Sequence, residues 1–376
     1  MNDNISKNIS NNISNNINSD NSNKDNNNKN NVNNKNNNGK NNNSENNNSE
    51  KIALVTGANG YVGQNVCREL LHHGYKVKAM HRKNSDISTI KDLPLELVEG
   101  DLIDIDSLDN ACKNVDYVFS IAGLFRQAKF PDEMYYKVNV GGIKNLLDMS
   151  IKHNVKRFIH CSTNGVMGPC YGKVLGEDAP YNPGDVYQDS KCEGEKIVKE
   201  YIKGNKILAS IIRPTMIWGV GDMRFLKLFK GIKNRTLPII GSGEFKTHWI
   251  LGTDLAVAFR LCAEKDEAVG QTYLIGGNEI VPLKRVYEEI AKFWRVKVLP
   301  FKIPAKPLQI LGDIVEKICV PFNIEPPIHR RRVDFFTKDR AFDISKAKRD
   351  LGFLPKHTFK EEVEIVGNWY KEVLSR

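Results

Sequence analysis

Short apolar runs alternate with amphipathic segments over residues 51–214. The apolar runs are predicted to be buried strands, at residues 52–55, 77–80, 95–98, 117–121, 157–161 and 208–212. Between them, apolar residues recur at helical spacing, most clearly over residues 62–71, 133–153 and 186–203. Strands and helices that alternate in this way are typical of βαβ units. The pattern predicts an α/β fold with a doubly wound parallel sheet, whose ligands bind at the carboxyl ends of the strands.

Two regions fall outside this pattern. Residues 1–50 are about half Asn and contain almost no large apolar side chains, so burial cannot offset the entropy of ordering them. We expect a disordered tail, although Asn-rich tracts can also mediate assembly. After residue 214, Pro and Gly are spread through short segments. Residues 215–376 are therefore expected to form a smaller, irregular region that binds substrate and returns some segments to the sheet.

Three glycines join the first predicted strand to the first helix. Gly57, Gly60 and Gly63 permit a tight turn there, and they let backbone N–H groups at the positive helix end approach a pyrophosphate. A G-x-x-G-x-x-G spacing alone also fits an ordinary strand-to-helix turn. The flanking strand and helix favour a dinucleotide site, to which Tyr61 and Val62 are assigned as well.

Tyr187 and Lys191 lie four residues apart on a predicted helix, so their side chains meet on one face. An ammonium beside a phenol stabilises the phenolate and suits the Tyr to proton transfer near neutral pH. A single Tyr-x-x-x-Lys among twelve Tyr is no more than chance would supply. Its place after the fifth strand adds weight, because Ser162 and Thr163 end that strand and could hold a reacting oxygen. They could equally be turn residues or cap a short helix.

Charge and cysteine content narrow the classes of function. The net charge of +10 lies on residues 51–376, but no nucleic-acid motif accompanies it and the basic residues are spread. Seven Cys show no C-x-x-C pair and no Cys/His spacing, so no metal site is expected. Without a secretory signal pattern, we expect a cytoplasmic protein.

No apolar run is long enough to be predicted as a transmembrane helix. The most apolar late stretch, residues 310–322, is interrupted by Asp313, Glu316 and Lys317. A core or pocket helix is the favoured interpretation of this stretch. Its attachment to a membrane surface remains open.

From residue 51 to about residue 370, the chain resembles the extended short-chain dehydrogenases/reductases, which include the NAD-dependent epimerases and dehydratases. The ordered set of motifs carries the resemblance. In chain order these are Thr56 to Gly63, Gly100-Asp101-Leu102, Ala122-Gly123, Val138-Asn139-Val140 before Gly142, Ser162-Thr163 with Val166 and Gly168, Tyr187-Gln188-Asp189-Ser190-Lys191 with Glu195, Arg213-Pro214-Thr215, and Lys346-Ala347 to Leu351-Gly352-Phe353 with Pro355.

The resemblance implies a catalytic set of Thr163, Tyr187 and Lys191. Tyr187 is then the general acid/base, Lys191 tunes it and binds the nicotinamide ribose, and Thr163 holds the reacting oxygen. The family's spacing back from Gly168 selects Thr163 rather than Ser162. Further residues are assigned to the cofactor site, namely Asp101, Leu102, Ala122, Gly123, Asn139 and Pro214, and Asn139 could instead only brace its helix.

The end of the second strand bears on the choice of cofactor. The sequence there is Met80-His81-Arg82-Lys83, without an acidic residue before Asp86. An acid would accept the ribose hydroxyl of NAD, whereas Arg82 can pair with the 2′-phosphate of NADP. NADP(H) is favoured and NAD(H) is possible, and these basic residues could also be plain surface charge.

Within the family, the chain looks closest to the dihydroflavonol reductase and 3β-hydroxysteroid dehydrogenase branch. Dehydratases place an Asp-Glu pair after the catalytic Thr, where this chain has Asn164-Gly165. The hypothesis is an oxidoreductase acting on a secondary alcohol or ketone of a small, fairly apolar molecule, with a homodimer possible. A UDP-sugar 4-epimerase with tightly bound NAD and a non-catalytic NADP sensor are the alternatives.

Overall fold

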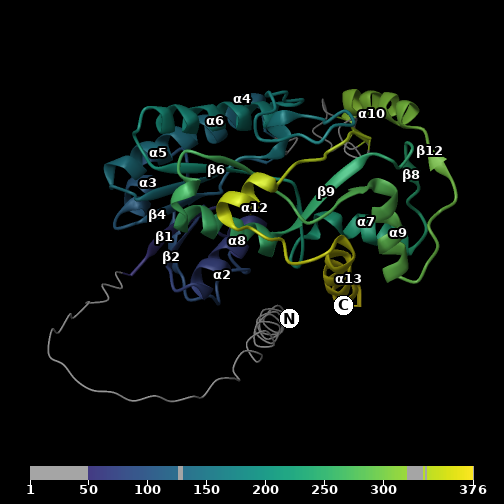
Figure 1. Cartoon of the computed structure of the whole chain (residues 1–376), viewed down its shortest axis with the longest axis horizontal. Coiled ribbons are helices and arrows are strands. Elements are labelled where there is room, and N and C mark those ends of the chain that lie inside the picture. Colours follow the sequence, from purple (N-terminus) through teal and green to yellow (C-terminus); the bar gives the residue numbers. More distant parts are fainter. Residues whose placement is uncertain (1–49, 126–129, 320–332, 335–336, 376) are drawn as a thin grey trace, which may run out of the picture. The chain divides into compact units, whose positions relative to one another are not determined.

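A parallel sheet of seven strands forms the centre of the fold (Figure 1). The computed structural model describes residues 50–125, 130–319, 333–334 and 337–375, so the predicted N-terminal tail lies outside the described residues. The strand order is β10-β6-β5-β4-β1-β2-β3, and every neighbouring pair is parallel. The strands are β1 (Ile52–Thr56), β2 (Lys76–His81), β3 (Glu96–Glu99), β4 (Tyr117–Ser120), β5 (Arg157–Cys161), β6 (Ala209–Pro214) and β10 (Thr272–Ile275). The predicted doubly wound parallel sheet is confirmed, and the strand order reverses between β1 and β4.

Helices cover both faces of this sheet, which explains why its strands are continuous apolar runs. One face carries α3 (Ile105–Cys112), α5 (Gly142–Lys152) and α6 (Val186–Lys203), and the other carries α2 (Tyr61–His72), α8 (Gly252–Glu264) and α12 (Ser345–Leu351). Helix α6 begins where Asp185 caps it by accepting from Gln188 N at 2.9 Å. Both ends of α6 match the sequence prediction.

The single long helix predicted over residues 133–153 is instead three consecutive segments. These are α4 (Asp132–Tyr136), a π-helical turn η1 (Lys137–Gly141) and α5. The π turn brings the carbonyl of Asn139 against α6, where a Cβ on Gly194 would lie 2.2 Å from the Asn139 oxygen. Such turns are frequent at functional sites.

The chain after Pro214 contains regular elements that the sequence pattern leaves unassigned. Strands β7 (Met216–Trp218), β9 (Lys246–Leu251) and β11 (Ile280–Pro282) form a second sheet, and β8 (Ile239–Ile240) pairs with β12 (Lys302–Ile303). The helices are α7 (Leu226–Lys233), α9 (Leu283–Phe293), α10 (Ala305–Cys319) and α13 (Phe359–Ser375), and the 3-10 turns of the fold are η2 (Asn164–Met167), η3 (Met223–Phe225) and η4 (Asp266–Ala268). Trp218 and Trp249 are buried together in a core that α7, α9 and α13 surround.

Helix α10 differs from its favoured interpretation as a core or pocket helix. Four of its large apolar side chains, Ile310, Leu311, Ile314 and Ile318, are exposed, and only Gly312 of the helix is buried. Leu308 and Val315 are half-buried. Among the described residues, no helix combines the length and apolar character needed to cross a bilayer.

Candidate active site

The loops that follow β1 and β4 meet where the strand order reverses. Gly57 has a φ of +65°, and a Cβ there would lie 3.0 Å from the Cα of Ala122. Between the loops, the Thr56 hydroxyl oxygen accepts from the N–H groups of Ile121 and Ala122, each at 3.0 Å. Glycine at position 57 is therefore required by both its backbone conformation and this close approach. The two loops form the floor of the crevice in which a dinucleotide binds in such sheets.

Helix α2 packs closely against the loop that follows β1. A Cβ on Gly63 would lie 2.2 Å from the carbonyl oxygen of Gly57, so only glycine lets the helix pack this near the strand. Gly60 is the N-cap residue, and its N–H donates to Gly57 O at 3.0 Å. Tyr61 and Val62 then open the helix, where N–H groups have no intrahelical acceptor. This end of α2 fits a pyrophosphate through the backbone alone.

The side chain of Tyr61 has a structural role apart from this phosphate site. Its hydroxyl donates to the carbonyl of Trp218 at 2.7 Å, and burial raises its pKa far above the usual value. The assignment of Tyr61 to the cofactor therefore concerns its backbone.

Lys191 lies at the centre of the site. Its side chain is buried, and Nζ donates to the carbonyl of Cys161, the last residue of β5, at 2.6 Å. A Cβ on Gly123 would lie 4.0 Å from this Nζ. Burial lowers the pKa of Lys191, while the neighbouring Cys161 and Glu195 act in the opposite direction. The ammonium thus stands between the ends of β4 and β5.

Tyr187 is half-buried in the first turn of α6, one helical turn before Lys191. The ring of Phe125, from the loop after β4, meets the Tyr187 ring edge to face with 5.0 Å between centroids. Gln188, the next residue, lies against Gly165 of the loop after β5. Three segments distant in sequence therefore meet around the phenol.

Ser162 and Thr163 point in different directions at the end of β5. The Ser162 hydroxyl is buried and donates to Glu195 Oε2 at 2.6 Å. Thr163 is half-buried, and its Oγ1 caps η2 by accepting from Gly165 N at 3.1 Å. Of the two hydroxyls, that of Thr163 is the more accessible.

The buried side chain of Asn139 links two segments of the site by hydrogen bonds. Its side chain accepts from Leu124 N at 2.8 Å and donates to Leu124 O at 3.1 Å and to Ser190 Oγ at 3.0 Å. Because the amide is fully buried and these bonds occupy it, Asn139 positions the loop after β4 and the start of α6.

The remaining predicted cofactor residues lie along the carboxyl edge of the sheet. Arg82 is exposed directly after β2. Asp101 is half-buried after β3 and accepts from Ile103 N at 3.2 Å, whereas Leu102 is buried against Gly142. Pro214 is buried at the end of β6, paired with Ile275 of β10.

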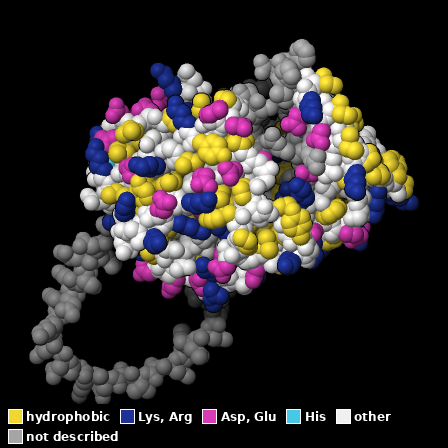
Figure 2. All heavy atoms as spheres, turned by 90° about the horizontal axis from the view of Figure 1, so that it is seen from above, with side chains coloured by type: hydrophobic (Ala, Val, Ile, Leu, Met, Phe, Trp, Pro, Cys, Tyr) yellow, Lys and Arg dark blue, Asp and Glu magenta, His cyan; other side chains and the backbone are white. Residues whose placement is uncertain are grey.

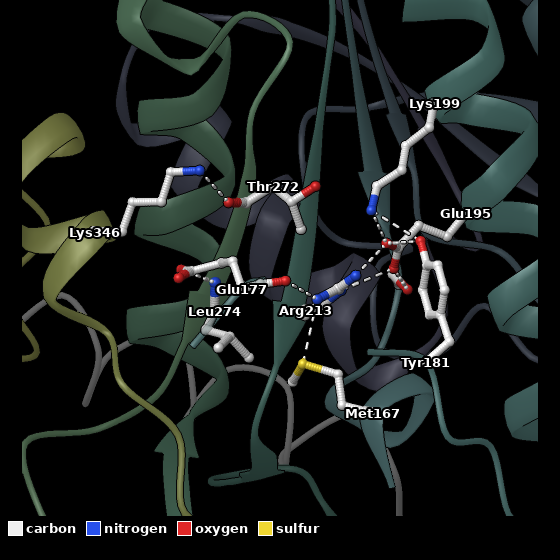
Figure 3. Close-up of polar contacts among 10 residues, drawn as sticks. Met167, Glu177, Tyr181, Glu195, Lys199, Arg213, Thr272, Leu274 and Lys346 are labelled. Carbon is white, nitrogen blue, oxygen red and sulfur yellow. Dashed lines mark hydrogen bonds and ion pairs between the residues drawn. The ribbon is translucent and has the colours of Figure 1, made fainter. Parts of the chain in front are cut away.

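Arg213 and Glu195 form a buried ion pair close to Lys191 in sequence (Figure 3). Arg213 Nε and Nη2 donate to the two carboxylate oxygens of Glu195 at 3.0 and 2.6 Å, and both side chains are at most 1% exposed. Tyr181 also donates to Glu195, at 2.8 Å, and Arg213 Nη1 donates to the carbonyl of Glu177 at 2.9 Å. Burial alone would raise the pKa of Glu195, but the hydrogen bonds and charge of Arg213 outweigh it and hold the pKa at about 2.

This ion pair joins elements on both sides of the site. Glu195 follows Lys191 by one turn of α6 and holds Ser162, the neighbour of Thr163. The Glu177 carboxylate in turn accepts from Leu274 N of β10 at 2.9 Å. The motifs of the sequence contain both Glu195 and Arg213 but assign neither a role. The only sequence signal for one was the helical spacing of Glu195 from Lys191.

Comparison with known proteins agrees with this geometry. The model of the NAD dependent epimerase/dehydratase family matches residues 53–276. A 3-beta-hydroxysteroid dehydrogenase of Mycolicibacterium neoaurum is 28% identical, covering 85% of this chain and 91% of that protein. A 2-alkyl-3-oxoalkanoate reductase of Stenotrophomonas maltophilia is 26% identical, over 82% and 96%. The crystal structure of gox2253 superposes with a TM-score of 0.73 and 27% identity, covering 86% of this chain and 99% of gox2253.

Proposed function

Since the chain belongs to the NAD dependent epimerase/dehydratase family, we propose that it is an NAD(P)-dependent oxidoreductase that interconverts a secondary alcohol and a ketone on a small, fairly apolar molecule. The observation that carries this proposal is the placement of Lys191. Its buried ammonium is held at the end of β5, one helical turn from Tyr187 and near the accessible Thr163.

The residues divide the work in the following way. Thr163 donates a hydrogen bond to the reacting oxygen, and Tyr187 gives that oxygen a proton during reduction or removes one during oxidation. The positive charge of Lys191 favours the phenolate form of Tyr187 and lets it exchange the proton near neutral pH. The glycine turn would hold the pyrophosphate of the cofactor, and Gly123 and Lys191 would lie beside its nicotinamide, the group that supplies or accepts the hydride.

The exposed side chain of Phe125 beside Tyr187 favours an apolar substrate. Phe125 is 47% exposed while its ring edge meets the Tyr187 ring. An exposed aromatic side chain at this position gains free energy by covering an apolar molecule. Two of the relatives are named for reactions on a steroid and on an alkyl oxoalkanoate.

Turnover of NADPH tests the proposed chemistry. Purified protein should oxidise NADPH with ketones from a panel of steroids, flavonoid-like compounds and alkyl oxoalkanoates. Tyr187→Phe should lower kcat by about 100-fold or more because the proton donor is lost, with the Kd for NADPH unchanged. Tyr136→Phe is the matched control, since the Tyr136 hydroxyl bonds to Asp189. Turnover that survives Tyr187→Phe unchanged would contradict the mechanism.

We further propose that Arg82 directs the protein toward NADP(H). Arg82→Glu should weaken NADPH binding at least tenfold, or about 1.4 kcal/mol, because a repelling carboxylate replaces the partner of the 2′-phosphate. Binding of NADH should change little. Lys76→Glu is the control, because Lys76 is an exposed cation at the opposite end of β2. Equal losses for NADPH and NADH would reject this assignment.

A further inference from the structure

Helix α10 presents large apolar side chains to the outside. Of the fifteen exposed large hydrophobic side chains among the described residues, four belong to this helix. We call these four the apolar face of α10: Ile310 (61% exposed), Leu311 (44%), Ile314 (50%) and Ile318 (60%). Their spacing of three to four residues aligns them along one side. Exposed apolar side chains gathered in this way mark an interaction site, whereas scattered ones do not.

The charged side chains of α10 differ in exposure according to their sign. Successive residues of a helix lie about 100° apart, so Glu316 lies on the side of α10 opposite Ile314. Asp313 lies at the edge, four residues before Lys317, and both acids are half-buried. Lys306 and Lys317 are exposed and lie along one edge of the apolar face. The exposed charged side chains of α10, Lys306 and Lys317, are thus both positive.

Figure 2 views the molecule from above, the side on which Figure 1 shows α10. Hydrophobic side chains gather along its right-hand part, among charged side chains of both signs. Phe301, which precedes β12, is a further exposed aromatic residue close to α10 in sequence, at 55% exposure. Lys302 beside it is exposed as well.

We propose that the apolar face of α10 binds the surface of an anionic phospholipid membrane. Amphipathic helices that lie in a membrane interface carry an apolar face with lysines beside it, and they do not span the bilayer. The isoleucines would enter the boundary between headgroups and acyl chains, and Lys306 and Lys317 would stay near the lipid phosphates. Attachment of this kind would place an enzyme for apolar molecules beside the phase in which such molecules dissolve.

A second copy of the chain is a poorer occupant of this face. In an antiparallel pairing of two α10 helices about a twofold axis, Lys306 of each copy would face Lys317 of the other, and like charges would repel. Four side chains of one helix also cover far less than the roughly 800 Å² per partner of a standard interface.

Vesicle flotation with the full chain tests the proposal without any substrate, so its result is independent of the proposed activity. The protein should float with vesicles of phosphatidylcholine containing phosphatidylserine. It should bind pure phosphatidylcholine more weakly, and high salt should reduce the difference. Replacing Ile310, Ile314 and Ile318 together with Ser should reduce binding at least tenfold. Lys306→Glu and Lys317→Glu should each weaken binding to the anionic vesicles by about fivefold.

Leu354→Ser is the matched control, because Leu354 is an exposed apolar residue outside α10. It should leave flotation unchanged, and circular dichroism with size exclusion would show that every variant is folded. The proposal is overturned if the parent protein does not float, or if the triple variant floats as well as the parent. Conversion of a dimer to a monomer by the triple variant, without vesicle binding by the parent, would identify a second copy as the occupant.

Discussion

Two buried glutamates of this protein lie in contrasting surroundings. Glu195, one helical turn after Lys191 on α6, receives a bidentate hydrogen bond from Arg213, and its pKa is about 2. Glu362 of α13 is 2% exposed and accepts a hydrogen bond from the indole of Trp218 at 2.7 Å. Burial raises the pKa of Glu362 to about 8. The charges of Asp254 and Glu279 also raise this pKa, whereas the hydrogen bond from Trp218 lowers it.

The difference shows that burial alone does not decide the charge of a carboxyl group here. A cationic partner keeps Glu195 ionised next to Lys191, whereas a neutral donor leaves Glu362 protonated at neutral pH. The region of the proposed chemistry therefore holds fixed charges. The region around α13 is held by aromatic packing and a neutral hydrogen bond.

Among the predicted changes in stability, the largest should follow from the replacement of Arg213. Arg213→Met removes the bidentate partner of the buried Glu195 carboxylate and leaves it only the partly exposed Lys199 as a cation. The free energy of unfolding should fall by about 3–5 kcal/mol. Chemical denaturation at pH 7 measures the loss. Adding Glu195→Leu to Arg213→Met should recover much of it, because the unpaired charge is gone.

An exposed ion pair provides the control for this substitution. Arg349 is 69% exposed and paired with Asp350. Arg349→Met should lower the free energy of unfolding by at most about 1 kcal/mol. If Arg213→Met were equally mild, the buried pair would not be the support inferred for it.

The protonated Glu362 should make stability depend on pH. Between the ordinary pKa of 4.5 and about 8, the unfolded state releases a proton that the folded state keeps. Stability therefore falls as the pH rises through this range. At about 1.4 kcal/mol per pH unit, the full loss is roughly 5 kcal/mol. Glu362→Gln, which can still accept from Trp218, should remove this slope.

Denaturation curves at pH 5, 7 and 9 measure the slope. Glu364→Gln, a change at an exposed position of the same helix, should keep the slope of the parent. An unchanged slope in Glu362→Gln would mean that another group titrates.

Much of the region proposed to bind the cofactor was predictable from sequence, because short segments of the chain mark its turns and helix ends. Asp185 caps α6 and the three glycines mark the turn into α2, so short segments carry both signals. The π turn at Asn139 was missed, since it depends on the close approach of Gly194 from another helix. Glu195 and Arg213 become partners only when β6 lies beside α6. The helices after Pro214 are stabilised by packing against each other, which short-range periodicity does not report.

The smallest expected effect concerns the link between Glu195 and catalysis. Glu195→Gln removes the negative charge that counteracts the effect of burial on Lys191, so Lys191 should lose its proton at lower pH. The alkaline limb of the kcat/KM profile should shift to lower pH, with kcat/KM reduced about tenfold near that limb. Glu193→Gln, on the exposed side of α6, should keep the parent profile. Parallel losses at every pH would indicate a purely structural role.

The central claim is that the site performs net hydride transfer to a carbonyl carbon. The most direct measurement is the fate of deuterium from NADPH that carries deuterium at both C4 positions of the nicotinamide, using the best ketone of the panel. We expect one deuterium on the carbinol carbon of each product molecule, with equal amounts of NADP formed and alcohol produced. Epimerised product without consumption of NADPH or incorporation of deuterium would contradict the account.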